Sequence, residues 1–271
     1  MSDPHHHHDP EQEMSHPAAA VDAEAFEAAA EAAMHTGKAG PKRVAVIFAH
    51  PDDAEFICAG TVARWVAEGH HVTYVLITSG NKGSDDPEMT PERLAAIRTV
   101  EQRDAAAILG VAECVFMDKP DGMLVPDLDL RRDMVRVIRS LKPDVVICQD
   151  PSVRYVAQSY LNHSDHRVAG DVTLDAIFPA ARNRMYFPEL LDEGLEPHKV
   201  SEVYLAGALQ PDVAIDITPY MDLKLAALRA HVSQLGDWDP TGELQRWARE
   251  DASRFPGSGE FAESFKYFKL D

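Results

Sequence analysis

The sequence has few cysteines and few basic residues, and each shortage excludes a class of protein. Its three cysteines, Cys58, Cys114 and Cys148, lie in apolar surroundings without a Cys-x-x-Cys spacing. They are therefore expected to be reduced core residues and not a disulfide framework. Lysine and arginine number 26 against 45 aspartates and glutamates, which gives a formal charge of −19. A chain this acidic is not expected to bind nucleic acid or an anionic membrane surface, because both partners require a basic patch.

Long hydrophobic runs and a signal peptide are also missing. No apolar stretch is long enough to span a membrane, and the N-terminus is polar and acidic. These absences predict a cytoplasmic protein without membrane insertion. The first strand-like segment also lacks a following Gly-x-Gly-x-x-Gly turn, which argues against a dinucleotide-binding module.

The 271 residues are enough for one large domain, and 45% of them are hydrophobic. Residues 1–41 are expected to be a partly disordered N-terminal tail with a possible helix over 21–35. The run His5–His8 in this tail is either a tag or a native metal-binding segment. Residues 42–271 are predicted to form a single catalytic α/β domain with a C-terminal extension. The last residues, which are rich in Gly, Pro and Phe, are expected to form a loop that packs on the body.

Strand-like and helix-like segments alternate from Lys42 onward. Most strand candidates are continuous apolar runs, as expected for strands that are buried on both faces of a parallel sheet. Candidate strands cover residues 43–49, 71–78, 113–118, 144–149, 202–208 and 213–217; candidate helices cover 57–68, 91–109, 128–140, 165–177, 219–235 and 244–254. This order predicts an α/β fold, a Rossmann-like three-layer sandwich with a mostly parallel central sheet.

Two groups of histidine and aspartate follow strands of the predicted sheet. Ligands of open parallel sheets bind beyond the carboxyl ends of the strands, so we expect the two groups to meet there. A catalytic zinc takes three His, Asp or Glu ligands and leaves one position for water. The groups are His50, Asp52 and Asp53 after the first strand, and His163, Asp165 and His166 after the fourth.

Three of these side chains are expected to bind a metal ion. His50 and Asp53 are three residues apart on a turn that leads into a helix, and His166 completes a His-Asp-His site. Zinc (Zn2+) is the expected ion, although such a site also accepts Fe2+, Mn2+ or Co2+. Taken separately, each motif has an alternative explanation. Asp53 could cap the helix that follows it, and the His-Ser-Asp-His loop could consist of solvated polar residues that bind no metal. The occurrence of both groups at strand ends of one sheet favours the metal site.

The remaining three side chains are candidates for catalysis. Asp52 is expected to take a proton from a water whose pKa the metal lowers. His163 is then free to stabilise the developing oxyanion or to protonate the leaving amine. Asp165 is expected to orient an imidazole by accepting its other N–H.

The two motifs resemble those of a known family. Ala49-His50-Pro51-Asp52-Asp53 followed by His163-Ser164-Asp165-His166 is similar to the pattern of the PIG-L/LmbE-like superfamily of zinc-dependent N-acetylglucosaminyl deacetylases. The similarity runs from about Arg43 to Leu235. It implies an LmbE/PIG-L-like fold, the metal ligands and the base given above, and a small N-acetylated sugar or conjugate as substrate. It also implies self-assembly into a trimer or hexamer.

Three further residues are candidates for substrate binding. Arg98 is similar to the family's substrate-contacting arginine, and the alternative is an ion pair with Glu101. Asn81 follows a strand at the rim of the sheet and is a candidate to line the pocket. His231 could reach the site from a late helix, and the alternative is a packed helix histidine.

The sequence therefore predicts a zinc-dependent N-deacetylase, a hydrolase that acts on a linear amide bond. We expect it to remove the acetyl group of an N-acetylglucosamine-type sugar or sugar conjugate by means of a metal-activated water. Two alternatives stay open. One is an amidase that acts on a larger glycoside or thiol conjugate, and the other is a non-catalytic metal-binding α/β protein.

Overall fold

A computed structural model of the chain describes residues 40–270. The run His5–His8 and the helix expected over residues 21–35 lie outside the described residues. None of the helices within the described range is both long and apolar enough to cross a membrane. The assignment of residues 42–271 to one catalytic domain stays a prediction.

Within residues 40–270, seven strands form the central sheet, in the order β3-β2-β1-β4-β7-β9-β8. The first five in this order are mutually parallel, whereas β9 is antiparallel to both of its neighbours. The predicted α/β fold with a mostly parallel sheet is thus confirmed. The strands are β1 (Arg43–Phe48), β2 (His71–Thr78), β3 (Glu113–Lys119), β4 (Val145–Gln149), β7 (Glu202–Ala206), β8 (Val213–Asp216) and β9 (Ala262–Lys269). A separate antiparallel hairpin consists of β5 (Tyr155–Val156) and β6 (Tyr160–Leu161).

The central strand β1 shows why the parallel strands read as continuous apolar runs. Its neighbours β2 and β4 bond to both of its edges, and helices cover both faces of the sheet. Side chains of a strand point alternately to the two faces. Val44, Val46 and Phe48 accordingly pack in one hydrophobic core, and Ala45 and Ile47 pack in the other.

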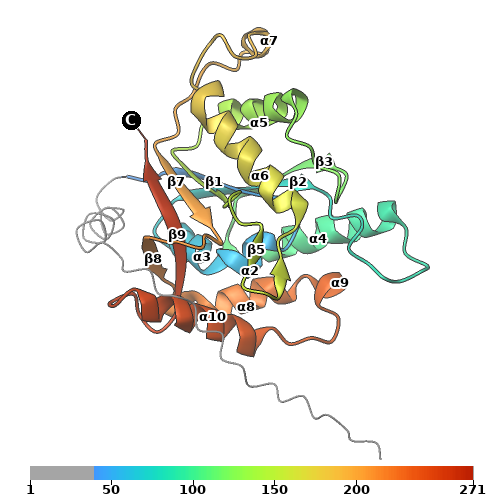
Figure 1. Ribbon diagram of the computed structural model, residues 1–271, viewed down its shortest axis with the longest axis vertical. Coiled ribbons are helices and arrows are strands. Elements are labelled where there is room, and N and C mark those ends of the chain that lie inside the picture. The colour runs from blue at the N-terminus through green and yellow to red at the C-terminus, as the bar shows by residue number, and fades with distance from the viewer. Residues whose placement is uncertain (1–39, 271) are drawn as a thin grey trace, which may run out of the picture.

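Helices cover the two faces of the sheet in separate layers (Figure 1). One layer contains α5 (Leu128–Leu141), α6 (Ser164–Asp175) and a short π-helical segment, η2 (Ala176–Ala180). The other contains α2 (Asp53–Ile57), α3 (Ala59–Ala67), α4 (Pro91–Leu109), α8 (Met221–Arg229) and α10 (Thr241–Arg254). Short helices α7 (Glu189–Asp192), η3 (Thr218–Tyr220) and α9 (Val232–Leu235) lie in the connections.

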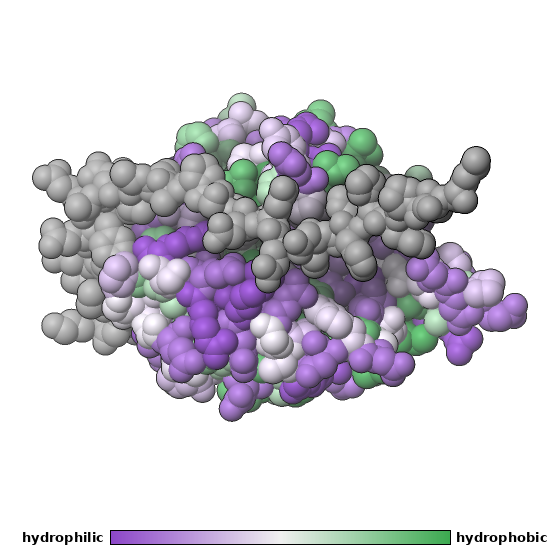
Figure 2. Space-filling view, turned by 60° about the horizontal axis from the view of Figure 1, so that its bottom comes forward, coloured by the Kyte–Doolittle hydropathy of each residue, from purple (hydrophilic) through white to green (hydrophobic). Residues whose placement is uncertain are grey.

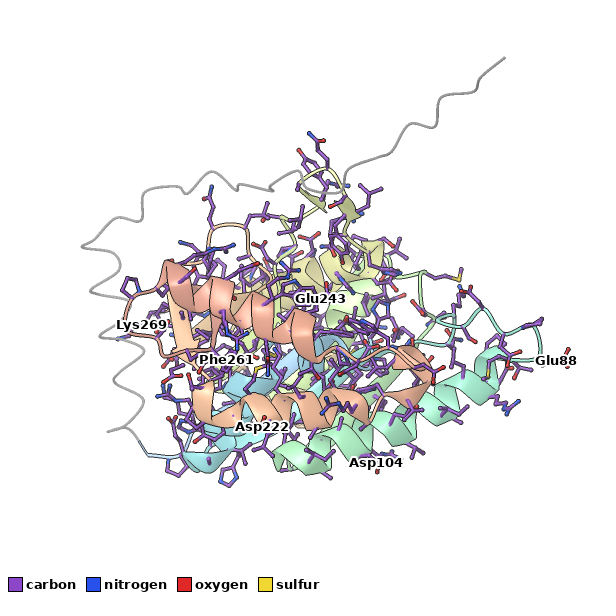
Figure 3. All side chains as sticks on the ribbon, turned by 90° about the horizontal axis from the view of Figure 1, so that it is seen from below. Glu88, Asp104, Asp222, Glu243, Phe261 and Lys269 are labelled. Carbon is purple, nitrogen blue, oxygen red and sulfur yellow. The ribbon has the colours of Figure 1, made fainter. Side chains whose placement is uncertain are left out.

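The second helical layer turns a hydrophilic face to solvent, on which acidic and basic side chains are mixed. Figure 3 shows α4, α8 and α10 side by side, with Asp104, Asp222 and Glu243 on them. The face turned to the viewer in Figure 2 is mostly hydrophilic, and its apolar side chains are scattered in small separate groups.

Helix α4 carries polar residues on its buried face and so supports the site described below. The helix begins where the Thr90 hydroxyl accepts a hydrogen bond from the Arg93 N–H at 3.2 Å. It ends at Gly110, whose φ of 76° lies in the left-handed region that suits glycine at a helix end. Between these ends, Arg98 and Gln102 lie one turn apart and are both buried.

The expectation of a loop at the C-terminus is wrong. Residues Ala262–Lys269 form β9, which lies between β7 and β8 and completes the sheet. Phe265 is fully buried in this strand, whereas its neighbour Lys266 is half-buried and bonds Asp212. Pro256, Gly257 and Gly259 before the strand obscured its pattern. The main partner of β9, β7, also lies far earlier in the chain, where no local pattern reveals it.

Candidate metal centre

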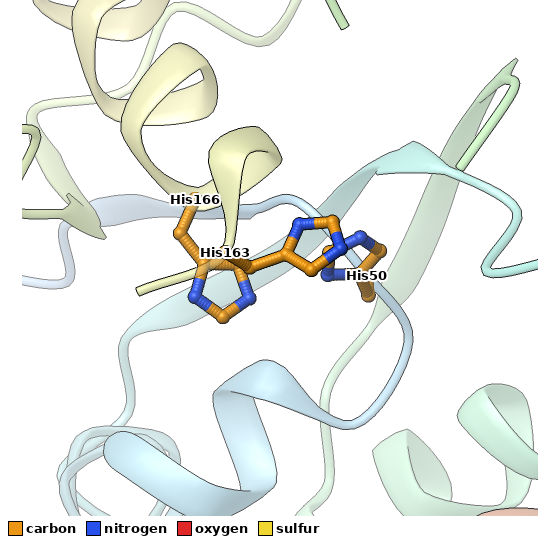
Figure 4. A group of neighbouring side chains, drawn as sticks. All are labelled: His50, His163 and His166. Atoms are coloured by element: carbon orange, nitrogen blue, oxygen red, sulfur yellow. The ribbon is translucent and has the colours of Figure 1, made fainter. Parts of the chain in front are cut away.

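The two predicted groups lie next to each other beyond the carboxyl ends of β1 and β4. His50 comes from the turn between β1 and α2, and His163 and His166 come from the start of α6 (Figure 4). The ring centre of His50 lies 4.7 Å from that of His163 and 5.2 Å from that of His166. One nitrogen from each of the three rings lies within 4.8 Å of the other two. Parallel strand ends thus bring together residues that are far apart in the sequence.

Asp53 lies between two of these imidazoles. Its Oδ1 is 3.1 Å from His166 Nε2, and its Oδ2 is 3.4 Å from His50 Nδ1. The Oδ2 atom also accepts hydrogen bonds from the His50 backbone N–H at 2.8 Å and from Gln149 Nε2 at 3.1 Å. Gln149 ends β4, so that strand helps to fix the carboxylate. The sequence interpretation missed Gln149, because a single glutamine at the end of an apolar strand carries no signal of its own.

A third segment, after β3, contributes an aspartate that the sequence interpretation also missed. Asp121 is buried, and its Oδ1 lies 2.9 Å from His50 Nε2. Asp165 Oδ2 lies 3.5 Å from the same nitrogen and accepts a hydrogen bond from the Gly122 N–H at 2.7 Å. His50, Asp121 and Asp165 form a second group able to hold a metal ion. The available signal was the position of Asp121 just after the third parallel strand.

The charges around His50 suit a cation. Burial lowers the pKa of His50, but the carboxylates of Asp53, Asp121 and Asp165 outweigh burial and raise it to about 12. Burial likewise raises the pKa of Asp53, yet His166 and His50 hold it well below its usual range. A pocket that keeps an imidazole protonated to this extent stabilises positive charge. Imidazole nitrogens and carboxylate oxygens are also common zinc ligands, so these residues fit a divalent metal ion.

His163 is the most exposed of the three histidines: its side chain is 43% exposed, against 17% for His166 and 9% for His50. Its Nδ1 accepts a hydrogen bond from the Asp165 N–H at 3.1 Å, so the ring caps the start of α6. Burial and the charge of His50 lower the pKa of His163, which favours the neutral ring. A neutral ring that accepts at Nδ1 carries its proton on Nε2. His163 is therefore set up to donate a hydrogen bond from Nε2.

Asp52 occupies an unusual backbone conformation at the start of α2. Its φ of 94° and ψ of −28° place it in the left-handed region, which costs a residue with a Cβ about 1–3 kcal/mol. The Asp52 N–H donates to Gln102 Oε1 at 3.0 Å. Burial raises the pKa of the Asp52 carboxyl to about 6, although the charge of Arg98 opposes the rise.

Arg98 is buried and bonds to the protein around Asp52. Its Nη2 donates to Asp52 Oδ2 at 3.0 Å and to the Pro51 carbonyl at 2.5 Å, and its Nη1 donates to the Gly80 carbonyl at 2.9 Å. A Cβ at Gly80 would lie 2.3 Å from Nη1, so this close approach requires glycine. Arg98 thus holds the Asp52 carboxylate in place, and its contact with substrate stays a prediction.

The other two candidates for substrate binding have different surroundings. Asn81 is half-buried, and its Oδ1 accepts a hydrogen bond from the Asp121 N–H at 3.1 Å; its contact with substrate stays a prediction. His231 is 0% exposed, and its Nε2 lies 3.3 Å from Glu55 Oε2. This burial places His231 as a packed helix-end histidine and does not support direct substrate contact. Glu101 bonds to Ser233, so the alternative ion pair between Arg98 and Glu101 is not formed.

The sheet and the His/Asp group at its edge define an α/β protein whose centre is suited to a metal ion. Residues 45–177 match the PIG-L family, described as GlcNAc-PI de-N-acetylase. A curated relative that covers 73% of the chain is 33% identical to it. The chain belongs to the PIG-L family of deacetylases.

Relatives in this family carry named deacetylase activities. The 33% identical relative is a diacetylchitobiose deacetylase from Thermococcus kodakarensis, and the aligned region covers 74% of its length. A 1D-myo-inositol 2-acetamido-2-deoxy-alpha-D-glucopyranoside deacetylase from Catenulispora acidiphila is 28% identical over 72% of this chain and 76% of its own. Among solved structures, the N,N'-diacetylchitobiose deacetylase from Pyrococcus horikoshii, in complex with its inhibitor MPG, superimposes with a TM-score of 0.80. That structure is 27% identical and covers 94% of this chain and 95% of its own.

Proposed function

We propose that this protein is a metal-dependent N-deacetylase that removes the acetyl group from an N-acetylglucosamine-type sugar. The observation that carries the proposal is the contact of Asp53 with both His50 and His166, with Asp52 next to it in the chain. Likeness to two diacetylchitobiose deacetylases favours a short N-acetylated oligosaccharide as the substrate class.

In this proposal, His50, Asp53 and His166 hold the metal ion, and zinc is the expected ion. A divalent ion bound there supplies Lewis-acid polarisation of the acetyl carbonyl and lowers the pKa of the attacking water. Asp121 and Asp165 keep the Nε2 side of His50 oriented through their contacts at 2.9 and 3.5 Å.

Proton transfer in the proposed reaction depends on Asp52 and His163. Asp52 takes a proton from the attacking water, and the same proton then passes to the amide nitrogen as the bond to the acetyl carbon breaks. His163 donates a hydrogen bond from Nε2 to the oxygen that gains negative charge on the acetyl carbon. The products are acetate and the free amino sugar.

A substrate panel tests the proposal. The metal-loaded protein is incubated with N,N'-diacetylchitobiose, N-acetylglucosaminyl malate and N-acetylglucosaminyl inositol, and free amine and acetate are both measured. Equal amounts of amine and acetate from at least one compound are expected, with diacetylchitobiose the first candidate. A larger thiol or glycoside conjugate with a different acyl group is assayed in parallel, and release of amine from it alone would favour the amidase alternative. No release from any compound by protein that contains its metal would favour the non-catalytic alternative.

Assembly and location are further expectations. The expected trimer or hexamer stays a prediction, which light scattering on the purified chain measures directly. The cytoplasmic location also stays a prediction.

A further inference from the structure

A chain of buried polar side chains runs from Asp52 into the core, away from the metal centre. The Asp52 N–H donates to Gln102 Oε1 at 3.0 Å, and Gln102 Nε2 donates to Glu55 Oε1 at 3.0 Å. Glu55 Oε2 lies 3.3 Å from His231 Nε2. Gln102, Glu55 and His231 are each 0% exposed. Burying polar side chains in an apolar core is costly unless they are hydrogen-bonded, so the bonds of Gln102 to Asp52 and Glu55 offset part of this cost.

The chain of contacts joins elements from three parts of the sequence. Asp52 is the N-cap residue of α2 and Glu55 lies in the first turn of that helix, Gln102 lies in α4, and His231 precedes α9. All three elements lie in the helical layer that also holds one of the two hydrophobic cores. A core at this position needs only apolar side chains, so packing alone does not account for the network.

The hydrogen bonds can run in only one direction. A backbone N–H only donates, so Gln102 must turn its carbonyl oxygen toward Asp52 and its amino group toward Glu55. Glu55 must then present an oxygen that accepts, and its second oxygen faces His231. Glu55 thus fixes which way the Gln102 amide points, and the amide in turn binds the backbone of Asp52.

We propose that Gln102 and Glu55 are positioning residues that hold Asp52 in its left-handed conformation and so aim its carboxylate at the reacting water. This inference rests on the proposed function of Asp52 as the base. Arg98 holds the carboxylate of Asp52, whereas Gln102 holds its backbone. Without the bond from Gln102, Asp52 has a lower-energy backbone conformation available, and its side chain would point elsewhere.

The substitution Gln102→Met tests this role, because methionine keeps the length of the side chain and removes the acceptor. We expect kcat to fall about 10- to 100-fold, as for loss of other supporting contacts in active sites, while KM and bound metal stay within about twofold of wild type. KM is spared because Asp52 acts only on bound substrate. An unchanged kcat, or a loss confined to KM, would overturn the proposal.

A matched control separates positioning from general damage to α4. Glu101 is the neighbouring buried residue, and its carboxylate accepts two hydrogen bonds from Ser233 without touching Asp52. Glu101→Met should lower the melting temperature at least as much as Gln102→Met and leave kcat within about threefold of wild type. Equal losses of kcat in both variants would reduce the network to a structural role.

An exchange of the two side chains provides a rescue. In the double variant Glu55→Gln with Gln102→Glu, residue 102 still accepts from Asp52, residue 55 donates to residue 102, and its oxygen still faces His231. Gln102→Glu alone places two carboxylates against each other and should lose most activity. The exchange should raise kcat about tenfold over that single variant, and failure to recover would count against the hydrogen-bond chain.

A double-mutant cycle distinguishes failure of this inference from failure of the proposed function. If Gln102 acts through Asp52, Gln102→Met should cause no further loss in an Asp52→Asn background. Full activity of Asp52→Asn would remove the proposed base and the proposed function with it. Low activity of Asp52→Asn with a further, additive loss from Gln102→Met would leave the base in place and overturn only the positioning role.

Discussion

Two buried ionic groups in this protein have opposite designs. Lys224 on α8 and Glu263 on β9 are each 3% exposed, and their side chains are 2.6 Å apart. Glu263 also accepts hydrogen bonds from the N–H groups of Gly60 and Thr61 at the start of α3. One cation, one anion and a helix N-terminus satisfy each other, so the group is closed and joins three elements.

The His/Asp centre has an excess of acceptors instead. Asp53, Asp121 and Asp165 all contact His50, and the second oxygen of Asp53 reaches His166. Carboxylates collected at the end of a sheet repel one another unless a cation joins them. In the Lys224–Glu263 pair the charges neutralise each other, so the pair connects structural elements. In the His/Asp centre the negative charges exceed the positive ones, so the group is suited to binding a cation from solution. Four substitutions or treatments test this contrast, beginning with the largest effect.

Removing one proposed metal ligand should have the largest effect. His166→Ala is expected to lose most bound metal and to reduce activity below detection, because one of three protein ligands is gone. Elemental analysis of wild type and variant measures the difference, which cancels any metal held by the run His5–His8. The exposed His71 on β2 provides the control, since His71→Ala should keep both metal and activity. Full metal content in His166→Ala would exclude His166 as a ligand.

Asp52→Asn should separate binding of the metal from catalysis. We expect kcat to fall about 10^3-fold, within the range for loss of a general base, because the amide cannot accept the proton. Metal content and melting temperature should match the wild type, since the amide oxygen of the substituted side chain can still accept from Arg98. Steady-state rates on diacetylchitobiose, paired with elemental analysis, make the measurement. A variant that retains most of the activity would show that another group accepts the proton.

Lys224→Met tests the closed pair and should leave the chemistry alone. Removing one partner strands the Glu263 carboxylate in the core, although two backbone N–H groups still bond it. We expect a loss of about 3 kcal/mol in the free energy of unfolding, with kcat unchanged in the folded protein. Urea unfolding measures it. The double variant Lys224→Met with Glu263→Gln should regain part of the lost stability. As a control, Arg246→Ala breaks the exposed pair of Arg246 with Glu250 and should lower the free energy of unfolding by less than about 1 kcal/mol.

Removal of metal should lower stability only through the loss of binding at the His/Asp centre. At a metal concentration about 100 times Kd, binding to the native state contributes about 2.7 kcal/mol, which a chelator should remove. Differential scanning calorimetry with chelator and with added zinc measures the shift. His166→Ala should show almost no shift, whereas Lys224→Met should show the full one. Equal shifts in wild type and His166→Ala would place the stabilising metal elsewhere.

The sequence predicted the parallel part of the fold well for a physical reason. Strands that are buried on both faces must be apolar at every position, so β1, β2 and β4 stand out as continuous runs. The edge of the sheet was harder to predict. Strand β9 exists because it pairs with β7 and β8, and such distant pairing leaves little trace in a local pattern.

The residues of the candidate site also fall into those that the sequence predicted and those that it did not. His50, Asp52, Asp53, His163 and His166 come in two compact motifs, and the sheet topology placed the motifs together. Their supporting residues are single polar side chains within ordinary elements, and only the folded chain shows what they contact. Gln149, Asp121, Gln102 and Glu55 belong to this second group.

The placement of β9 has a consequence for how the protein is made. A nascent chain that has emerged as far as Asp216 contains β8 but not the strand that β8 pairs with, and β7 still has an open edge. Both edges close only after residues 262–269, which form β9, have been synthesised. The residues of the proposed metal centre, from His50 to His166, all precede this strand, so the chain makes them before this flank of the sheet can close.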